Sequence, residues 1–276
     1  MARRLTGRQW AGRVKRRRPA DMEKEGDMAE APRLLLLETS GRSGFVGLAE
    51  RETLRGLRRL DESRRHARDL APATAELLAA QGWKARGLHG VVVSRGPGSY
   101  TGLRVGIMSA KTLAYAVGCA LIAVDTFAVV ADQMPAGVGR VDVLADAQQD
   151  KVYVQSWGRI PILPDARTGL ESCPTFAPLD ALAVRPFTEW LAERPADAWV
   201  SGPGLHRWAP RLPAGLPAVD TALWDPQPGN LLRLGLARYL AGERDDVFAL
   251  EPLYLRASSA EEQQRARQGA AREANS

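Results

Sequence analysis

Three turns rich in glycine and hydroxyl residues are the parts of this sequence that could bind an anion such as a phosphate. Each follows a short apolar run, at 34–37, 91–93 and 199–200. Ligands of α/β proteins bind at such strand ends, and the amides that open a following helix favour negative charge. The same residue types also serve as ordinary turn formers. The candidates for a nucleotide or anion site are Glu38, Thr39, Ser40, Gly96, Gly98, Ser99, Thr101, Gly202 and Gly204.

The spacing of the central turn, 96–102, excludes the common phosphate and nucleophile motifs. A Walker A loop needs Lys and then Ser or Thr after its last glycine, whereas Leu103 and Arg104 follow here. The GxSxG nucleophile motif fails because Ser99 directly follows Gly98. The glycine spacing, G-x-G-x-x-x-G, misses the dinucleotide fingerprint by one residue. The turn therefore predicts no more than a loosely specified anion site.

The histidines and cysteines form neither a metal site nor a catalytic set. His66, His89 and His206 are the three histidines, and none lies at metal-ligand spacing from another. Cys119 and Cys173 are far apart and belong to no CxxC or Cys/His cluster. We therefore nominate no catalytic residue and no metal ligand, and the cysteine usage fits a reducing compartment.

An α/β framework must position these turns. Residues 34–37 and 45–49 flank a polar, glycine-bearing turn and predict a β-hairpin. Residues 91–93, 102–118 and 120–124 predict a strand, a helix and a strand, which together make a right-handed crossover unit. These elements carry two of the three candidate turns.

Further elements are predicted on both sides of this unit. Helices are expected at 61–81 and 127–134, and another follows Asp225-Pro226 and ends at Gly242. Beyond a Pro/Gly break at 135–139, strands are predicted at 141–144 and 152–157, with a polar turn between them, and again just before Gly202. Residues 158–186 are rich in proline and show no period that assigns an element.

The helix at 102–118 carries a small residue at every fourth position. The row comprises Gly102, Gly106, Ala110, Ala114 and Gly118. Such a row forms a shallow groove that another helix can approach closely. That contact would offset the roughly 0.5–1 kcal/mol that a glycine costs inside a helix. The neighbour could be a helix of the same chain or a helix of another subunit.

The basic character of the chain comes from its first 20 residues. The formal net charge is +6, but residues 1–20 hold eight Lys and Arg and no acid, so the remainder carries −2. By overall charge the folded part is not a basic nucleic-acid binder. The run Lys15–Arg18 could bind RNA or act as a targeting signal, but a solvated tail is favoured. We expect residues 1–27 to be dispensable, with Met28 as an alternative start.

Composition predicts two lobes between two disordered ends. We expect a disordered basic extension at 1–32, a first lobe at 33–136 to which 222–256 returns, a second lobe at 137–221, and a disordered tail at 257–276. The chain shows no apolar run of membrane-spanning length and no secretory signal. These observations predict a cytoplasmic protein.

The central turn and its helix closely resemble the GPGSFTGLRIG motif of the TsaB (YeaZ) family. The match runs from Gly96 to Gly106 and continues through Ala110-Lys111 and 121–124. The resemblance implies an α/β fold of the actin-like ATPase or sugar-kinase-like (ASKHA) type, with two lobes that are each a mixed sheet flanked by helices. Supporting matches are Glu38-Thr39-Ser40, where the family usually has Asp-Thr-Ser, His66 with Leu70 and Pro72, Asp146-Ala147, Val152-Tyr153 and Tyr254-Leu255-Arg256.

The resemblance also implies a function in forming threonylcarbamoyladenosine next to the anticodon of tRNA. Family members act as the non-catalytic partner of the similar, catalytic TsaD subunit, alongside a TsaE-type ATPase. We therefore expect a heterodimer with a TsaD-type subunit, a homodimer when the chain is alone, and contact with tRNA only through the complex. No cofactor is expected for this subunit, and ATP or ADP would belong to the complex. The two metal-binding histidines of TsaD-like proteins correspond here to Thr126 and Val130, which cannot replace them.

Two functions stay open on the sequence. As a scaffold, and not an enzyme on its own, the chain would contact TsaD through the helices around 66–78 and 102–118. The alternative is a stand-alone ATP-binding phosphotransferase of the sugar-kinase type that uses Glu38 and the turn at Gly202. Such a kinase needs carboxylates for Mg²⁺ and a base for the acceptor hydroxyl, and the second lobe offers no convincing pair. The residues assigned to the partner interface are His66, Leu70, Gly102, Arg104, Gly106, Ala110 and Ala114.

Overall fold

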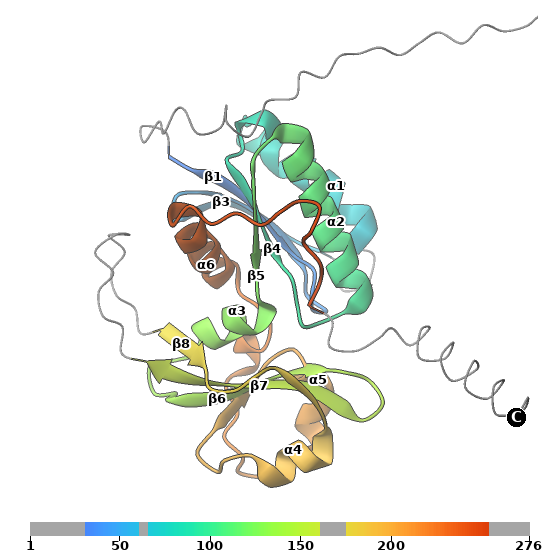
Figure 1. Cartoon of the computed structure of the whole chain (residues 1–276), viewed down its shortest axis with the longest axis vertical. Coiled ribbons are helices and arrows are strands. Elements are labelled where there is room, and N and C mark those ends of the chain that lie inside the picture. The colour runs from blue at the N-terminus through green and yellow to red at the C-terminus, as the bar shows by residue number, and fades with distance from the viewer. Residues whose placement is uncertain (1–30, 61–65, 161–174, 254–276) are drawn as a thin grey trace, which may run out of the picture. The chain divides into compact units, whose positions relative to one another are not determined.

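Two five-stranded mixed sheets form the framework of the chain (Figure 1). The computed structural model describes residues 31–60, 66–160 and 175–253. The strands are β1 (Arg33–Glu38), β2 (Phe45–Glu50), β3 (Thr53–Arg59), β4 (Gly90–Ser94), β5 (Ala120–Val124), β6 (Arg140–Asp146), β7 (Lys151–Ile160), β8 (Thr175–Pro178), β9 (Ala183–Pro186) and β10 (Trp199–Ser201). The α-helices are α1 (His66–Ala80), α2 (Tyr100–Val117), α3 (Thr126–Asp132), α4 (Phe187–Glu193), α5 (Leu205–Trp208) and α6 (Pro228–Leu240).

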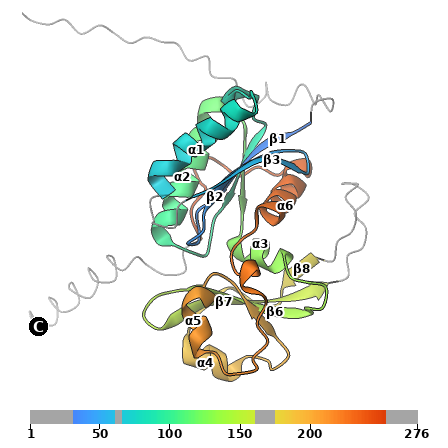
Figure 2. The same cartoon turned by 180° about the vertical axis from the view of Figure 1, so that it is seen from behind.

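The first sheet has the strand order β3-β2-β1-β4-β5, with β1 antiparallel to β2 and parallel to β4. The apolar run of β1 is buried on both faces. Leu35 and Leu37 pack with α1 and α2, whereas Leu34 and Leu36 pack with α6. In Figure 1, α1 and α2 accordingly lie on one side of this sheet and α6 on the other, and Figure 2 shows β1, β2 and β3 side by side. The predicted hairpin and strand–helix–strand unit are confirmed.

The second sheet repeats the arrangement of the first. β6 pairs antiparallel with β7 and parallel with β10, and β8 and β9 both pair with β7. Its core includes Phe187 and Trp208, whose rings stack with centroids 4.4 Å apart. Each sheet therefore contains a hairpin followed by a parallel strand, β4 in the first sheet and β10 in the second. These two strands lead into the candidate turns that contain Gly96 and Gly202.

Helix α2 spans Tyr100–Val117, where the sequence predicted 102–118, and both of its ends are capped. Ser99 is the N-cap, and its hydroxyl accepts the amide of Gly102 at 3.3 Å. Gly118 ends the helix in the left-handed conformation, with a φ of 74°, and its amide bonds to the carbonyl of Ala114 at 2.9 Å. These caps fix where the candidate turn stops and where the helix starts.

Several elements were not predicted. β3 follows the β1–β2 hairpin although its side chains are mostly exposed, and β8, β9 and α4 lie in or just after the stretch without a clear pattern. The predicted helix at 61–81 is described from His66 onward. The two ends predicted to be disordered lie almost wholly outside the described residues, so that prediction is untested. The lobe boundaries at 137 and 222 also stay a prediction, although α6 does pack on the first sheet.

Candidate functional site

The carboxylate of Glu38, at the end of β1, is held within a closed set of hydrogen bonds. Glu38 is fully buried. Its Oε1 accepts the amide of Ser40 at 2.6 Å and the Ser40 hydroxyl at 2.5 Å. Its Oε2 accepts the hydroxyl of Ser94, the last residue of β4. Both carboxylate oxygens are therefore engaged by the chain itself, and they tie β1 to the neighbouring strand.

The surroundings of Glu38 favour its protonated form. Burial, which is the largest cause, raises its pKa above the ordinary value of 4.5. The hydrogen bonds from Ser40 and Ser94 lower the pKa and so oppose this effect, and the nearby charge of Asp225 adds to the increase. A carboxyl in this state binds a cation less readily than a free carboxylate would, because its charge is disfavoured.

Thr39 joins the turn to α2. The residue is buried, and its Oγ1 donates a hydrogen bond to the carbonyl of Gly102 at 2.8 Å. A Cβ on Gly102 would lie 2.0 Å from the Thr39 carbonyl oxygen, and a Cβ on Gly106 would lie 2.1 Å from Thr39 Oγ1. The two glycines are therefore required by close contact with the turn after β1.

The central Gly/Pro turn packs on the same segment. The amide of Ser99 donates to the Ser40 carbonyl at 2.7 Å, and a Cβ on Gly98 would lie 2.4 Å from that oxygen. Gly96 has a φ of 112°, and its amide donates to Thr126 Oγ1 at 3.2 Å. The structure thus brings together the candidates of the first two turns, but in a packed arrangement in which several amides already have acceptors.

The third candidate turn lies on the second sheet. Gly202 has a φ of 111°, and a Cβ there would lie 2.3 Å from the carbonyl oxygen of Leu144 on β6. The amide of Gly204 donates to the same oxygen at 2.9 Å. Gly202 and Gly204 therefore let β10 turn closely over β6, in the way that Gly98 packs on the end of β1.

The sequence reading missed a polar pair beside the first turn. His206 Nε2 and Asp225 Oδ2 are 2.8 Å apart. The other oxygen, Asp225 Oδ1, is buried without a hydrogen-bond partner among the described residues and lies 3.3 Å from where a Cβ on Gly41 would be. Gln133 holds the same segment through its Nε2, which donates to the carbonyl of Asp225 at 3.0 Å. No local pattern could reveal this pair, because Asp225 also fits the start signal of the following helix.

The row of small residues does not form the exposed docking surface that the sequence suggested. Gly102, Gly106, Ala110 and Ala114 are all buried within the chain, and Leu70 of α1 is buried in the core between α1, α2 and the first sheet. The row instead packs against other parts of the same chain, which is the internal alternative. Gly102 and Gly106 pack against the turn at Thr39. Of the assigned interface residues, Arg104 is exposed, and the side chain of His66 lies outside what the structure describes.

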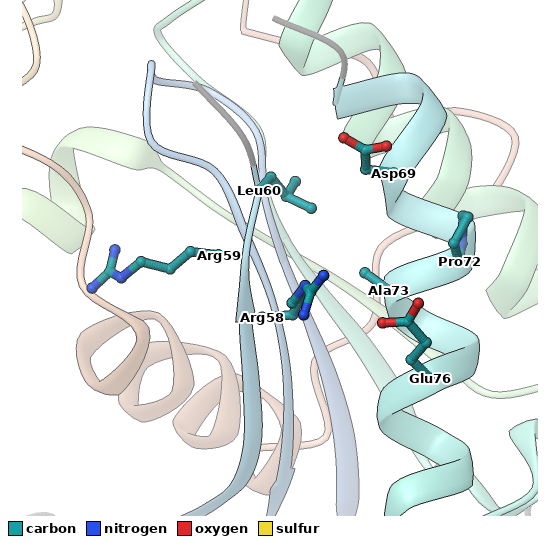
Figure 3. Close-up of a pocket in the computed structure, with 7 residues that line it drawn as sticks. All are labelled: Arg58, Arg59, Leu60, Asp69, Pro72, Ala73 and Glu76. Carbon is teal, nitrogen blue, oxygen red and sulfur yellow. The ribbon is translucent and has the colours of Figure 1, made fainter. Parts of the chain in front are cut away.

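A groove of about 550 Å³ lies between β3 and α1 (Figure 3). Arg58 points toward the helix, which carries Asp69 and Glu76, whereas the adjacent Arg59 points to the other face of the sheet. The groove thus has charges of both signs on its walls. Among the described residues, no three His, Cys, Asp or Glu side chains are grouped as a metal site would require.

Comparisons with known proteins agree with this fold. The family model described as TsaD, tRNA N6-adenosine threonylcarbamoyltransferase, matches residues 56–170. The chain is 27% identical to the tRNA threonylcarbamoyladenosine biosynthesis protein TsaB of Bacillus subtilis, over 83% of this chain and 96% of that protein. It is 28% identical to the protein of the same name from Escherichia coli, over 70% of this chain and 81% of the relative.

A solved structure is also similar to this chain. YeaZ from Pseudomonas aeruginosa aligns with a TM-score of 0.65 and 27% identity, over 81% of this chain and all of that one. This likeness, together with the two mixed sheets flanked by helices, confirms the expected α/β actin-like fold. The 96–106 motif, the fold and these relatives agree, and they confirm the resemblance of this chain to the TsaB (YeaZ) family.

Proposed function

We infer that this chain takes part in threonylcarbamoyladenosine biosynthesis in tRNA, as the non-catalytic partner of a TsaD-type subunit. The likeness to the Bacillus subtilis TsaB, which extends over 83% of this chain, carries the inference. The comparisons do not favour the sugar-kinase alternative. We further propose that a TsaE-type ATPase is a second partner, that the subunit needs no cofactor of its own, and that it works in the cytoplasm.

The geometry of the turns supports a structural role for this subunit. Both oxygens of Glu38 are bound within the chain, and the Ser99 amide is used by Ser40. Phosphate-binding loops instead keep their amides aimed at the ligand. The segment that the sequence offered as an anion site therefore acts here as a rigid connection between β1, β4 and α2.

The outer face of α2 is the surface we propose for the TsaD-type partner. Met108 and Tyr115 lie seven residues apart, on the same face of the helix, and are 62% and 65% exposed. The Tyr115 ring lies edge-on to Phe248, which is 76% exposed, with centroids 5.6 Å apart. Exposed apolar residues that gather in this way mark protein interfaces. We propose this face as the partner interface in place of the row of small residues, which is buried.

A co-purification experiment tests this proposal. We expect the double variant Met108→Glu/Tyr115→Glu to stay folded and to lose co-purification with a TsaD-type protein. Leu240→Glu is the control, because Leu240 is 48% exposed at the end of α6, on the other face of the sheet. Equal recovery of the partner with both variants would show that the outer face of α2 is not the interface. A melting curve for each variant identifies any loss that comes from unfolding.

A further inference from the structure

The two edges of the first sheet differ in whether their backbone groups are already bonded. At the β5 edge, the carbonyl of Leu121 accepts the amide of Asp245 at 2.8 Å, and the amide of Ala123 donates to Asp245 Oδ2 at 2.7 Å. The carbonyl of Ala123 accepts a hydrogen bond from the guanidinium of Arg238. β3 is the other edge, and its side chains are mostly exposed. Because an open edge can pair with a further strand, the first sheet can be extended at β3 and not at β5.

Leu57 and Arg59 direct their backbone groups toward the open edge of β3. The amide of Leu60 donates to the carbonyl of Gly44 at 2.8 Å, which makes these two residues a hydrogen-bonded pair of the β2–β3 ladder. Such pairs alternate with pairs whose amides and carbonyls point away from the neighbouring strand. Leu57 and Arg59 stand at the alternate positions. Among the described residues nothing bonds to their amides or carbonyls, which are therefore free to pair with another strand.

Leu54, Leu57 and Arg59 lie on one side of β3, the side of α6. Leu54 and Arg59 are in register with Ala49 and Phe45 of β2, whose side chains pack in the core beneath α6. Residues opposite each other in a sheet share a side. A β-bulge inserts one extra residue between Leu54 and Leu57, which is why both lie on this side although they are three residues apart. The two leucines are 37% and 41% exposed, so α6 does not cover them.

Arg59 supplies the positive charge on this side of the strand. Arg55 is already engaged, because its Nη2 lies 2.7 Å from Glu50 Oε2 and its carbonyl accepts Gln81 Nε2 at 3.0 Å. Arg58 points toward α1, which carries acidic residues of its own, whereas Arg59 points to the other side (Figure 3). Arg59 forms no ion pair within the part of the chain that the structure describes. The exposed side of β3 therefore offers two leucines and one positive charge beside a free backbone edge.

We propose that β3 binds an extended strand of a partner protein, which presents apolar side chains to Leu54 and Leu57 and a carboxylate to Arg59. In strand addition the main-chain hydrogen bonds supply affinity, and the alternate side chains supply specificity. All three side-chain contacts lie on one side of β3, so the partner strand must carry two apolar residues and one acidic residue at alternate positions. The proposal concerns a surface separate from the outer face of α2 and does not rest on the function inferred above.

Other occupants match this edge less well. β3 of a second copy has no acidic residue to offer Arg59, and it would bring two sets of three arginines together across the new pair of strands. Like charges that face each other across strands are destabilising. RNA would pair its phosphates with the arginines but would leave the two leucines and the free amides of the edge without a matching group.

An NMR titration of the isotopically labelled full chain with a synthetic peptide tests the proposal. The probe is the capped peptide Thr-Glu-Thr-Val-Thr-Val-Thr, which places its acid and two valines opposite Arg59, Leu57 and Leu54 when it runs antiparallel to β3. We expect the amide signals of Leu57 and Arg59 to shift most, with a Kd below about 1 mM. The same peptide N-methylated at its first valine keeps every side chain but loses one donor to the edge, so it should bind about tenfold more weakly.

Variants of the chain test the two kinds of side-chain contact. Leu54→Thr/Leu57→Thr keeps residues that favour strands and should weaken binding about fivefold. Arg59→Gln should weaken binding about threefold at low salt and less at high salt, as expected for an exposed ion pair. Arg58→Gln is the matched control, because it removes the same charge from the neighbouring residue on the opposite side of β3. It should bind the peptide as the wild type does.

Several results would overturn the proposal. The first is that the peptide shifts no signal of β3, and the second is that the N-methylated peptide binds the wild-type chain equally well, a comparison that needs no variant to fold. Equal loss of affinity in Arg58→Gln and Arg59→Gln would also contradict it. If dilution of the chain alone shifts the amides of Leu57 and Arg59, a second copy occupies the edge. If a tRNA transcript shifts these amides and Leu54→Thr/Leu57→Thr does not weaken it, the surface binds RNA and not a protein strand.

Discussion

Gly106 of α2 stands directly against Thr39 of the turn after β1, where a Cβ on the glycine would lie 2.1 Å from Thr39 Oγ1. The next nearest atom is Thr39 Cβ, at 3.3 Å, which is a tight but tolerable contact. One hydroxyl oxygen therefore requires glycine at this position. This contact also explains why the row of small residues lies inside the chain.

Gly106→Ala should lower the free energy of unfolding by about 1–3 kcal/mol, because the added methyl group overlaps Thr39. The better helix propensity of alanine offsets only about 0.5–1 kcal/mol of this loss. In the Thr39→Ala background the hydroxyl is gone, so most of the penalty for Gly106→Ala should disappear. Urea unfolding of the two single variants and the double variant measures this coupling.

Gly102→Ala is the matched comparison. Its added Cβ would lie 2.0 Å from the Thr39 carbonyl oxygen, which a side-chain change cannot remove. We expect this variant to be at least as unstable as Gly106→Ala and to gain nothing from Thr39→Ala. If Thr39→Ala restored stability equally to both glycine variants, the two glycines would not contact different atoms of Thr39.

Stability should depend on pH through Glu38. Its pKa is raised by burial, so the folded state holds the proton more tightly than the unfolded state does. The stabilisation is therefore fully present below the ordinary pKa of 4.5 and is lost as the pH rises through the raised folded value. Glu38→Gln keeps a carbonyl acceptor for Ser40 and does not titrate. We expect it to gain stability relative to the wild type as the pH rises above 4.5, measured as urea midpoints at a series of pH values. If the stability of Glu38→Gln relative to the wild type fell as the pH rises, burial would not raise the pKa of Glu38 in the folded state.

Gln133 should stabilise the segment that leads into α6. Its Nε2 donates to the carbonyls of Leu223 and Asp225 at 2.6 and 3.0 Å, and its Oε1 accepts the amide of Gln227 at 3.1 Å. Gln133→Ala should cost about 1–3 kcal/mol, since these partly buried groups lose their partner. Gln155→Ala is the control, because Gln155 makes one exposed hydrogen bond to Asp180. Thermal melts that shift equally for the two variants would argue against a special role for Gln133.

The thiol of Cys119 should react slowly. Burial raises its pKa from 9.0 to about 11, so little thiolate is present near neutral pH. We expect iodoacetamide at pH 7.5 to leave Cys119 largely unmodified in the folded chain and to modify it rapidly in urea. Peptide mass spectrometry measures the alkylation of Cys119 separately from that of Cys173. Rapid labelling of the native protein would show that Cys119 is more accessible than the structure indicates.

The sequence predicted the elements with strong local patterns. The apolar runs of β1, β4 and β5, and the helix α2 up to Gly118, were all readable, because burial on both faces and a glycine at the helix C-terminus leave clear signals. β3 was not readable, because this edge strand contains Arg55, Arg58 and Arg59 and has little buried surface. Exposed edge strands lack the alternation that identifies half-buried ones.

The candidate site shows a different limit of sequence reading. The four-residue spacing correctly indicated a closely packed face on α2, but spacing cannot say what fills that face. The neighbour is a turn 63 residues away in the chain, at Thr39, and not a second helix. The pair of His206 and Asp225 was missed for a related reason, since the fold alone brings the two residues together.

The most direct test of the proposed function is reconstitution of the modification. A purified TsaD-type enzyme and a TsaE-type ATPase would be supplied with threonylcarbamoyl-AMP and unmodified tRNA, with and without this chain, and threonylcarbamoyladenosine would be measured by mass spectrometry of the digested RNA. We expect modification only when this chain is present and none from this chain alone. Modification at the same level without this chain would contradict the proposed role.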